Sequence, residues 1–107
     1  MGFETLLSCS CRMARVGAVL QAALGAENVL KPPPEMGAED FSEFVGAGVP
    51  GVYLWVGAVE PAKVAAAKAG GPPLPSTHSS LFAPDRERTL RTAVLAETLA
   101  ALELIKK

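Results

Sequence analysis

One histidine and two cysteines are the only imidazole and thiol side chains in this 107-residue sequence. They are His78, Cys9 and Cys11. A zinc site usually takes three or four protein ligands, most often Cys and His, and a two-metal hydrolytic centre needs more. The sequence therefore predicts that any metal centre involving this chain takes most of its ligands from elsewhere.

His78 lies in a Gly- and Pro-rich segment, Gly70–Ser80, and Ser79 follows it. A neutral imidazole on a loop suits a zinc- or manganese-class ion. The alternative is a loop histidine that only caps a turn, and composition alone favours this alternative.

Glu39 and Asp40 form an acidic pair where a short helix is expected to begin. Adjacent side chains on a helix point about 100° apart, so the two do not act as a facing acid and base. One of them can face a site while the other caps the helix or meets solvent. Favourable interaction with the helix dipole is an equally good explanation of the pair.

Cys9 and Cys11 are separated by one residue. A disulfide across that spacing is strained, and we interpret the two as structural or incidental thiols. The stretch before Cys9 weakly resembles a lipoprotein cleavage box, but it is short and carries Glu4 in place of a basic residue. We therefore expect no signal peptide. The localisation stays open at this point, with a lean towards the cytoplasm.

Charge and hydropathy exclude two classes of partner. The formal net charge is -1, with Lys and Arg scattered, so no basic surface for nucleic acid is predicted. No apolar run approaches the roughly 18 residues of a membrane span. Half of the residues are hydrophobic, which is typical of a globular chain.

The periodicity predicts alternating helices and strands. Helices are expected at Arg12–Leu24, Glu39–Val45, Pro61–Ala69 and Asp85–Ile105, and strands at Glu27–Lys31 and Val52–Val56. This order fits the trailing part of an α/β layered domain. The second strand is continuously apolar, which predicts an interior strand covered on both faces. Two strands make a thin sheet, so the fold is expected to be incomplete on its own.

Two apolar faces are expected to form the core. The first helix presents Met13, Val16, Leu20 and Leu24. The last helix presents Leu90, Val94, Ala101 and Leu104 on one side, with Leu95, Leu99 and Leu102 beside them. The second arc is wide enough to pack on a sheet.

Three segments in order resemble one known family. They are Met36-Gly-Ala-Glu-Asp-Phe41, Val49-Pro-Gly-Val-Tyr-Leu-Trp-Val-Gly57 and His78-Ser-Ser-Leu-Phe82, followed by a long final helix. This order resembles the carboxyl-terminal catalytic segment of the hippurate hydrolase and indole-acetyl-amino-acid amidohydrolase family, which are two-metal, aminoacylase-like metallopeptidases. The resemblance extends from about Arg12 to Ile105.

The resemblance implies a partial three-layer α/β catalytic domain over residues 12–107, with residues 1–11 an unrelated, disordered leader and no lid or dimerisation domain. His78 matches a ligand of a zinc- or manganese-class ion. Gly37, Glu39, Asp40 and Ser79 match the active-site wall. Ser80 stands where the family has Pro, which loosens the loop.

The family's general base and most of its metal ligands belong to an amino-terminal portion that has no counterpart here, so no catalytic residue is assigned. The implied function is that of a fragment, inactive alone, of an enzyme that hydrolyses N-acyl amino acids with a metal-activated water. Two alternatives remain. The chain is one half of a split amidohydrolase, or it is a non-catalytic interaction domain whose exposed strand edges need a partner or self-association.

Overall fold

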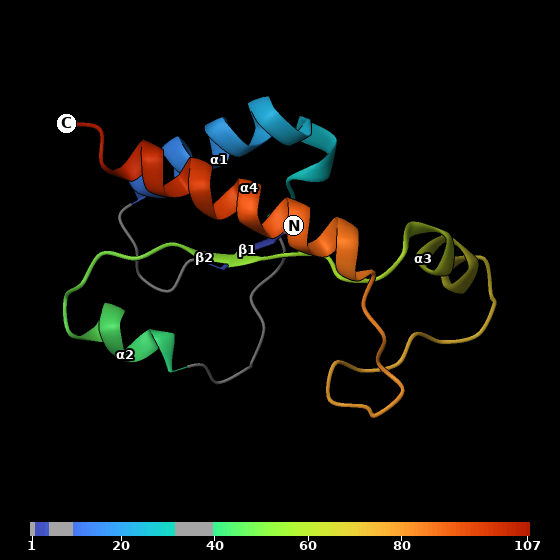
Figure 1. The fold of residues 1–107 in the computed structure, drawn as a ribbon. Helices are drawn as coiled ribbons and strands as arrows, with labels where there is room; N and C mark the ends of the chain where they lie inside the picture. The colour runs from blue at the N-terminus through green and yellow to red at the C-terminus, as the bar shows by residue number, and fades with distance from the viewer. Residues whose placement is uncertain (1, 5–9, 32–39) are drawn as a thin grey trace.

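The computed structural model describes residues 2–4, 10–31 and 40–107 (Figure 1). Its elements are β1 (Gly2–Glu4), α1 (Ser10–Leu24), the 3-10 helix η1 (Ala26–Asn28), α2 (Phe41–Gly46), β2 (Tyr53–Trp55), α3 (Pro61–Lys68) and α4 (Arg86–Leu104). The four predicted helices are present, and their ends differ from the predicted ones by at most two residues. The described part is mainly helical, and no three-layer sheet is present in it.

The core lies between α1 and α4, which run side by side in Figure 1. Val16 and Leu20 of α1 are fully buried, as the spacing of apolar residues predicts. They meet Ala96 and Ala100 of α4. Val29 completes the buried cluster. Packing of these two helix faces therefore provides most of the burial in the described residues.

The packed face of α4 differs from the predicted one. Ala96 and Ala100 are buried, whereas Leu90 and Val94 are 63% and 65% exposed. The prediction placed the large apolar residues inside because they release the most free energy on burial. The structure instead sets small residues against α1, which allows two helices to approach closely. Of the large side chains predicted to be buried, Leu99 packs against this core, whereas Leu90, Val94 and Leu102 face solvent.

β2 is part of a two-stranded antiparallel sheet with β1. Phe3 pairs with Leu54 in its register. Leu54 packs against the helical core, while Tyr53, which alternates with it, contacts the ring of Phe41 from α2. The strand predicted as interior thus has one neighbour within the described chain. That neighbour comes from the segment expected to be a disordered leader, and α1 also begins inside that segment, at Ser10.

The predicted strand at Glu27–Lys31 does not form, and within it only Leu30 makes an isolated β-bridge. Residues Ala26–Asn28 form a 3-10 turn, which begins after Gly25 at a φ of 89°. Glycine adopts this left-handed conformation without the steric cost of a Cβ atom. The Asn28 side-chain amide then donates to the Leu24 carbonyl oxygen at 2.7 Å, which satisfies one of the last carbonyls of α1.

The molecule is elongated for its length. The radius of gyration of the Cα atoms is 15.2 Å, whereas a compact chain of this size has about 13 Å. Many large apolar side chains of the described part are also more than a third exposed. A small core and an extended shape leave surface that further polypeptide can cover.

Candidate functional site

His78 lies on the long loop that joins α3 to α4, and its side chain is exposed. Two serine hydroxyl groups shape the backbone around it. The His78 backbone N–H donates to Ser76 Oγ at 3.3 Å, and the Leu81 N–H donates to Ser79 Oγ at 3.1 Å. Such side-chain turns organise a loop without regular secondary structure. The predicted site residue Ser79 therefore acts within this loop as a hydrogen-bond acceptor.

The far end of this loop is anchored to the segment after β2. The Asp85 backbone N–H donates to the Ala58 carbonyl oxygen at 2.8 Å. One turn into α4, the Thr89 hydroxyl donates to the Gly57 carbonyl oxygen at 3.4 Å. These two hydrogen bonds hold the beginning of α4 beside the segment that follows β2. The carboxyl-terminal end of the His78 loop is therefore fixed in position.

Asp40 occupies the N-cap position of α2, where its side chain makes no capping hydrogen bond. The other two residues of the predicted acidic wall, Gly37 and Glu39, lie outside the described residues. Figure 1 shows α2 at one end of the molecule and the loop between α3 and α4 at the other. The structure therefore does not bring Asp40 together with His78.

The described residues do not assemble a metal centre around His78. No group of three or more His, Cys, Asp or Glu side chains within residues 10–31 and 40–107 is placed to hold an ion. A single imidazole provides one of the three or four protein ligands that zinc takes. The residues present do not fit a complete site, so no reaction step is assigned to a metal in this chain.

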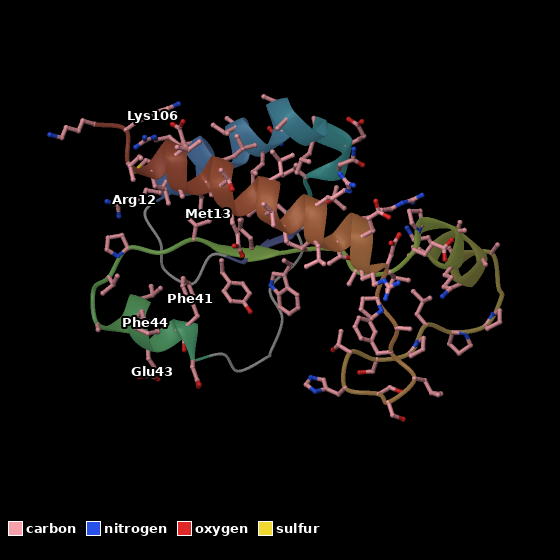
Figure 2. The ribbon with its side chains drawn as sticks, in the orientation of Figure 1. Arg12, Met13, Phe41, Glu43, Phe44 and Lys106 are labelled. Carbon is pink, nitrogen blue, oxygen red and sulfur yellow. The ribbon has the colours of Figure 1, made fainter. Side chains whose placement is uncertain are left out.

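Three aromatic rings form a cluster on the outer side of β2. The ring centroids of Phe41 and Tyr53 are 5.3 Å apart, and those of Tyr53 and Trp55 are 5.8 Å apart. Figure 2 shows Phe41 pointing from α2 toward the strand, and Glu43 pointing away from it. Tilted and edge-on ring pairs of this kind are packing arrangements. The cluster attaches α2 to the sheet, although Trp55 is 42% exposed and the cluster lies outside the buried core.

One cavity was not predicted from the sequence. It has a volume of about 680 Å³ and lies between the end of α1, the segment after β2, α3 and the first turns of α4. Leu30, Val59 and Val64 contribute apolar walls, and the ion pair of Asp85 with Arg88, at 3.5 Å, lies at its edge. None of the predicted site residues lines it. Its walls come from four separate segments, so only the tertiary structure brings them together.

No family is shown by comparison with known proteins. Neither the protein-family models, nor the curated proteins, nor the solved structures give a significant match to this chain. Among the helices that the structure describes, none is long and apolar enough to cross a membrane.

Proposed function

We propose that this chain is the carboxyl-terminal portion of the catalytic domain of a metal-dependent amidohydrolase that acts on N-acyl amino acids. In this proposal His78 supplies one ligand of a zinc- or manganese-class ion, and the remaining ligands and the general base come from other polypeptide. The three-layer α/β domain is complete only in that assembly. A cytoplasmic location is part of the same proposal.

The position of His78 carries the proposal. Its imidazole is exposed on a loop whose backbone is organised by Ser76 and Ser79, and among the described residues no side chain forms a hydrogen bond or ion pair with the ring. A histidine that only caps a turn would use its ring for a local hydrogen bond. An accessible, uncommitted ring on an ordered loop is instead available to an ion brought by other polypeptide.

Two features of the surface support the proposal that further polypeptide packs against this chain. β2 has β1 on one side, and no strand among the described residues pairs with its other side. Unpaired strand edges carry backbone donors and acceptors that readily pair with another strand. The elongated shape points the same way. Further strands of a larger sheet would satisfy this edge and cover the apolar surface.

The first test is the reading frame immediately upstream of Met1, in the same or an adjacent gene. The proposal expects it to encode the missing ligands, as His and acidic residues, together with a Glu base. Co-expression of that polypeptide with this chain is then expected to give a complex that hydrolyses N-acyl amino acids only when metal is present. His78→Ala should abolish turnover while the complex persists, and Ser80→Ala should retain turnover.

The purified chain alone provides the second test. We expect no tight, stoichiometric zinc and no turnover, because one ligand is too few. Stoichiometric zinc with turnover that His78→Ala removes would show that the site is complete here. An upstream frame without ligand residues, together with failure to form a complex, would reject the catalytic ancestry.

A non-catalytic interaction domain is the second candidate, and a different observation favours it. The outward face of α4 exposes large apolar side chains although the described chain has no side-chain cluster suited to metal chemistry. Exposed apolar surface of this kind is a common mark of an interaction site. If the chain folds cooperatively without other polypeptide, this candidate gains over the first.

A further inference from the structure

We propose that the cavity between α3 and α4 binds a small zwitterion with an apolar body, that is, a free amino acid or a short peptide with apolar side chains. This inference does not involve His78 and is independent of the proposed catalytic ancestry. It rests on three properties of the cavity: the helix faces that form it, the apolar side chains in its walls, and the charged groups that line it.

Two helices each present one regular face to the cavity. The lining residues include Pro61, Val64 and Lys68 of α3, and Asp85, Thr89 and Thr92 of α4 and its N-cap. Residues three and four apart share one side of a helix. The cavity of about 680 Å³ therefore lies between two facing helix surfaces. Its volume is within the range of pockets that hold small ligands.

The base of the cavity is fixed by two hydrogen bonds. The Asp85 N–H donates to the Ala58 carbonyl oxygen at 2.8 Å, and the Thr89 hydroxyl donates to the Gly57 carbonyl oxygen at 3.4 Å. They hold the first turn of α4 beside the segment that leads to α3, and Figure 1 shows α3 beyond the start of α4. Walls that are already in place cost little to order when a ligand binds.

Apolar side chains from three segments form much of the wall. Leu24 and Leu30 come from the end of α1 and the residues after η1, Val59 follows β2, and Val64 belongs to α3. Leu30 is 59% exposed, and the other three are half-buried. The core therefore leaves part of their apolar surface available. An aliphatic ligand removes such surface from water, which is favourable.

Four charged residues line the cavity, and two of them neutralise each other. Asp85 and Arg88 form an ion pair at 3.5 Å. The other two are Glu27 of η1 and Lys68 at the end of α3. Neither of these makes an ion pair or a side-chain hydrogen bond within the described part of the chain. One carboxylate and one ammonium group, from different walls, are therefore available to a ligand.

A zwitterion is the ligand that satisfies both groups. The four charges that line the cavity sum to zero, so a ligand with a net charge gains from one group and is repelled by another. An amino acid or peptide with free ends carries one ammonium and one carboxylate group. Its ammonium group pairs with Glu27 and its carboxylate with Lys68, while its side chains cover the apolar walls.

NMR titration of the isotope-labelled full chain with leucine and with dileucine tests the binding. Each is expected to shift the backbone amide signals of Val64, Lys68 and Thr89 in a saturable way. The expected Kd is roughly millimolar, because ligands with so few atoms bind weakly. The tighter of the two identifies the ligand as an amino acid or as a peptide. Diglycine carries the same charges without an apolar body and should bind about tenfold more weakly.

Removing one charge at a time tests the two ionic contacts. Amidation of the tighter probe removes its carboxylate, and acetylation removes its ammonium group. Each change should weaken binding to the wild type about threefold. Lys68→Met should bind the amidated and free probes alike, because the partner of the carboxylate is gone, and Glu27→Gln should bind the acetylated and free probes alike.

Matched controls lie on the same two helices but outside the cavity. Lys63 of α3 pairs with Glu60, and Glu97 is exposed on α4. Lys63→Met and Glu97→Gln should discriminate among the probes as the wild type does. Circular dichroism checks that every variant keeps its helices, which is expected because Glu27 and Lys68 are both exposed.

Three outcomes would overturn the proposal. The first is the absence of saturable shifts up to about 20 mM of either zwitterion, well above the expected Kd. The second is equal binding of the free, amidated and acetylated probes to the wild type, which would mean apolar association without recognition of charge. The third is a loss of discrimination in Lys63→Met that equals the loss in Lys68→Met.

Discussion

Arg15 of α1 makes two contacts with Glu103, near the end of α4. Its Nε lies 3.2 Å from Glu103 Oε1, and its Nη2 donates to the Glu103 backbone carbonyl oxygen at 2.6 Å. Lys106 also binds this carboxylate, with Nζ 2.7 Å from Oε2. The three residues connect the two core helices where the carbonyl groups of α4 lack partners within the helix. This contact joins positions 88 residues apart in the sequence.

Removing this contact should loosen the packing of α1 against α4. Arg15→Ala is expected to lower the melting temperature by a few degrees, because it removes both the ion pair and the bond to the carbonyl oxygen. Arg91→Ala is the control. Arg91 pairs with Glu87 four residues earlier on the same exposed face, so its loss should change little. Equal effects of the two variants in thermal denaturation would contradict the structural role of Arg15.

Acid should remove part of the stability of this helix pair. Hydrogen bonds from Lys106 and then from Arg15 hold the pKa of the Glu103 carboxyl group below its ordinary value of 4.5. A pKa lowered in the folded state adds stability that is full above the unfolded value and is lost as the pH falls through the folded value. Urea unfolding below pH 4.5 should therefore lose less stability in Glu103→Gln than in the wild type. Glu43→Gln, at an exposed position of α2 away from this contact, should retain the wild-type acid response.

Because the core is small, each fully buried residue contributes a large share of the free energy of unfolding. Leu20→Ala is expected to cost about 2–5 kcal/mol, which is the range for deleting a buried leucine side chain. That is a large part of the stability of a small domain. Leu90→Ala, at an exposed position of α4, should cost less than about 0.5 kcal/mol. Denaturation followed by circular dichroism measures both, and similar costs would mean that α4 packs through its other face.

Enlarging a side chain on the face of α4 that packs against α1 tests how closely the two helices approach. Ala96→Leu should destabilise the chain by about 1–3 kcal/mol, because Ala96 has no exposed surface and the added atoms meet α1. Ala101→Leu places the same atoms at an exposed position and should be tolerated. Measurement at low protein concentration keeps any association from masking the comparison. If Ala96→Leu stabilises the chain, the close approach of the two helices is wrong.

Two glycines of the α1 region should respond oppositely to alanine. Gly17 lies within α1, and an added Cβ would meet nothing within 4 Å, so Gly17→Ala should stabilise by about 0.5–1 kcal/mol. Gly25 has a φ of 89° and ends the helix. Gly25→Ala should cost about 1–2 kcal/mol, because a side chain is disfavoured in that conformation. Thermal unfolding of the pair provides the comparison, and a stabilising Gly25→Ala would be inconsistent with the observed turn.

Local patterns predicted the helices well. The spacing of Val16 and Leu20 identified the buried face of α1, and Gly25 identified its end, because both depend only on residues within a turn or two. The same reasoning failed for Glu27–Lys31. There the left-handed glycine and the bond from Asn28 to Leu24 continue the chain as a turn, and these local contacts outweigh the β propensity of so short a segment.

The sequence indicated single candidate site residues, but it did not predict which of them lie close together in the fold. His78 lies on the predicted loop and is exposed. Asp40 begins α2, which lies at the opposite end of the molecule in Figure 1, and the cavity near α3 involves none of the predicted residues. The types of side chain indicate which chemistry is available, but proximity between distant segments depends on packing.

The sequence by itself determined where helices form and end, and that a lone histidine lies on a Gly- and Pro-rich loop. These properties follow from local backbone preferences and from the number of residues of each type in the sequence. The tertiary structure alone decided that α4 meets α1 through Ala96 and Ala100, and that β2 pairs with β1. The reason is that α4 has apolar residues on nearly every side, so periodicity allows several faces to be buried. Only the close fit of small side chains between two helices selects one, and that choice leaves Leu90 and Val94 exposed.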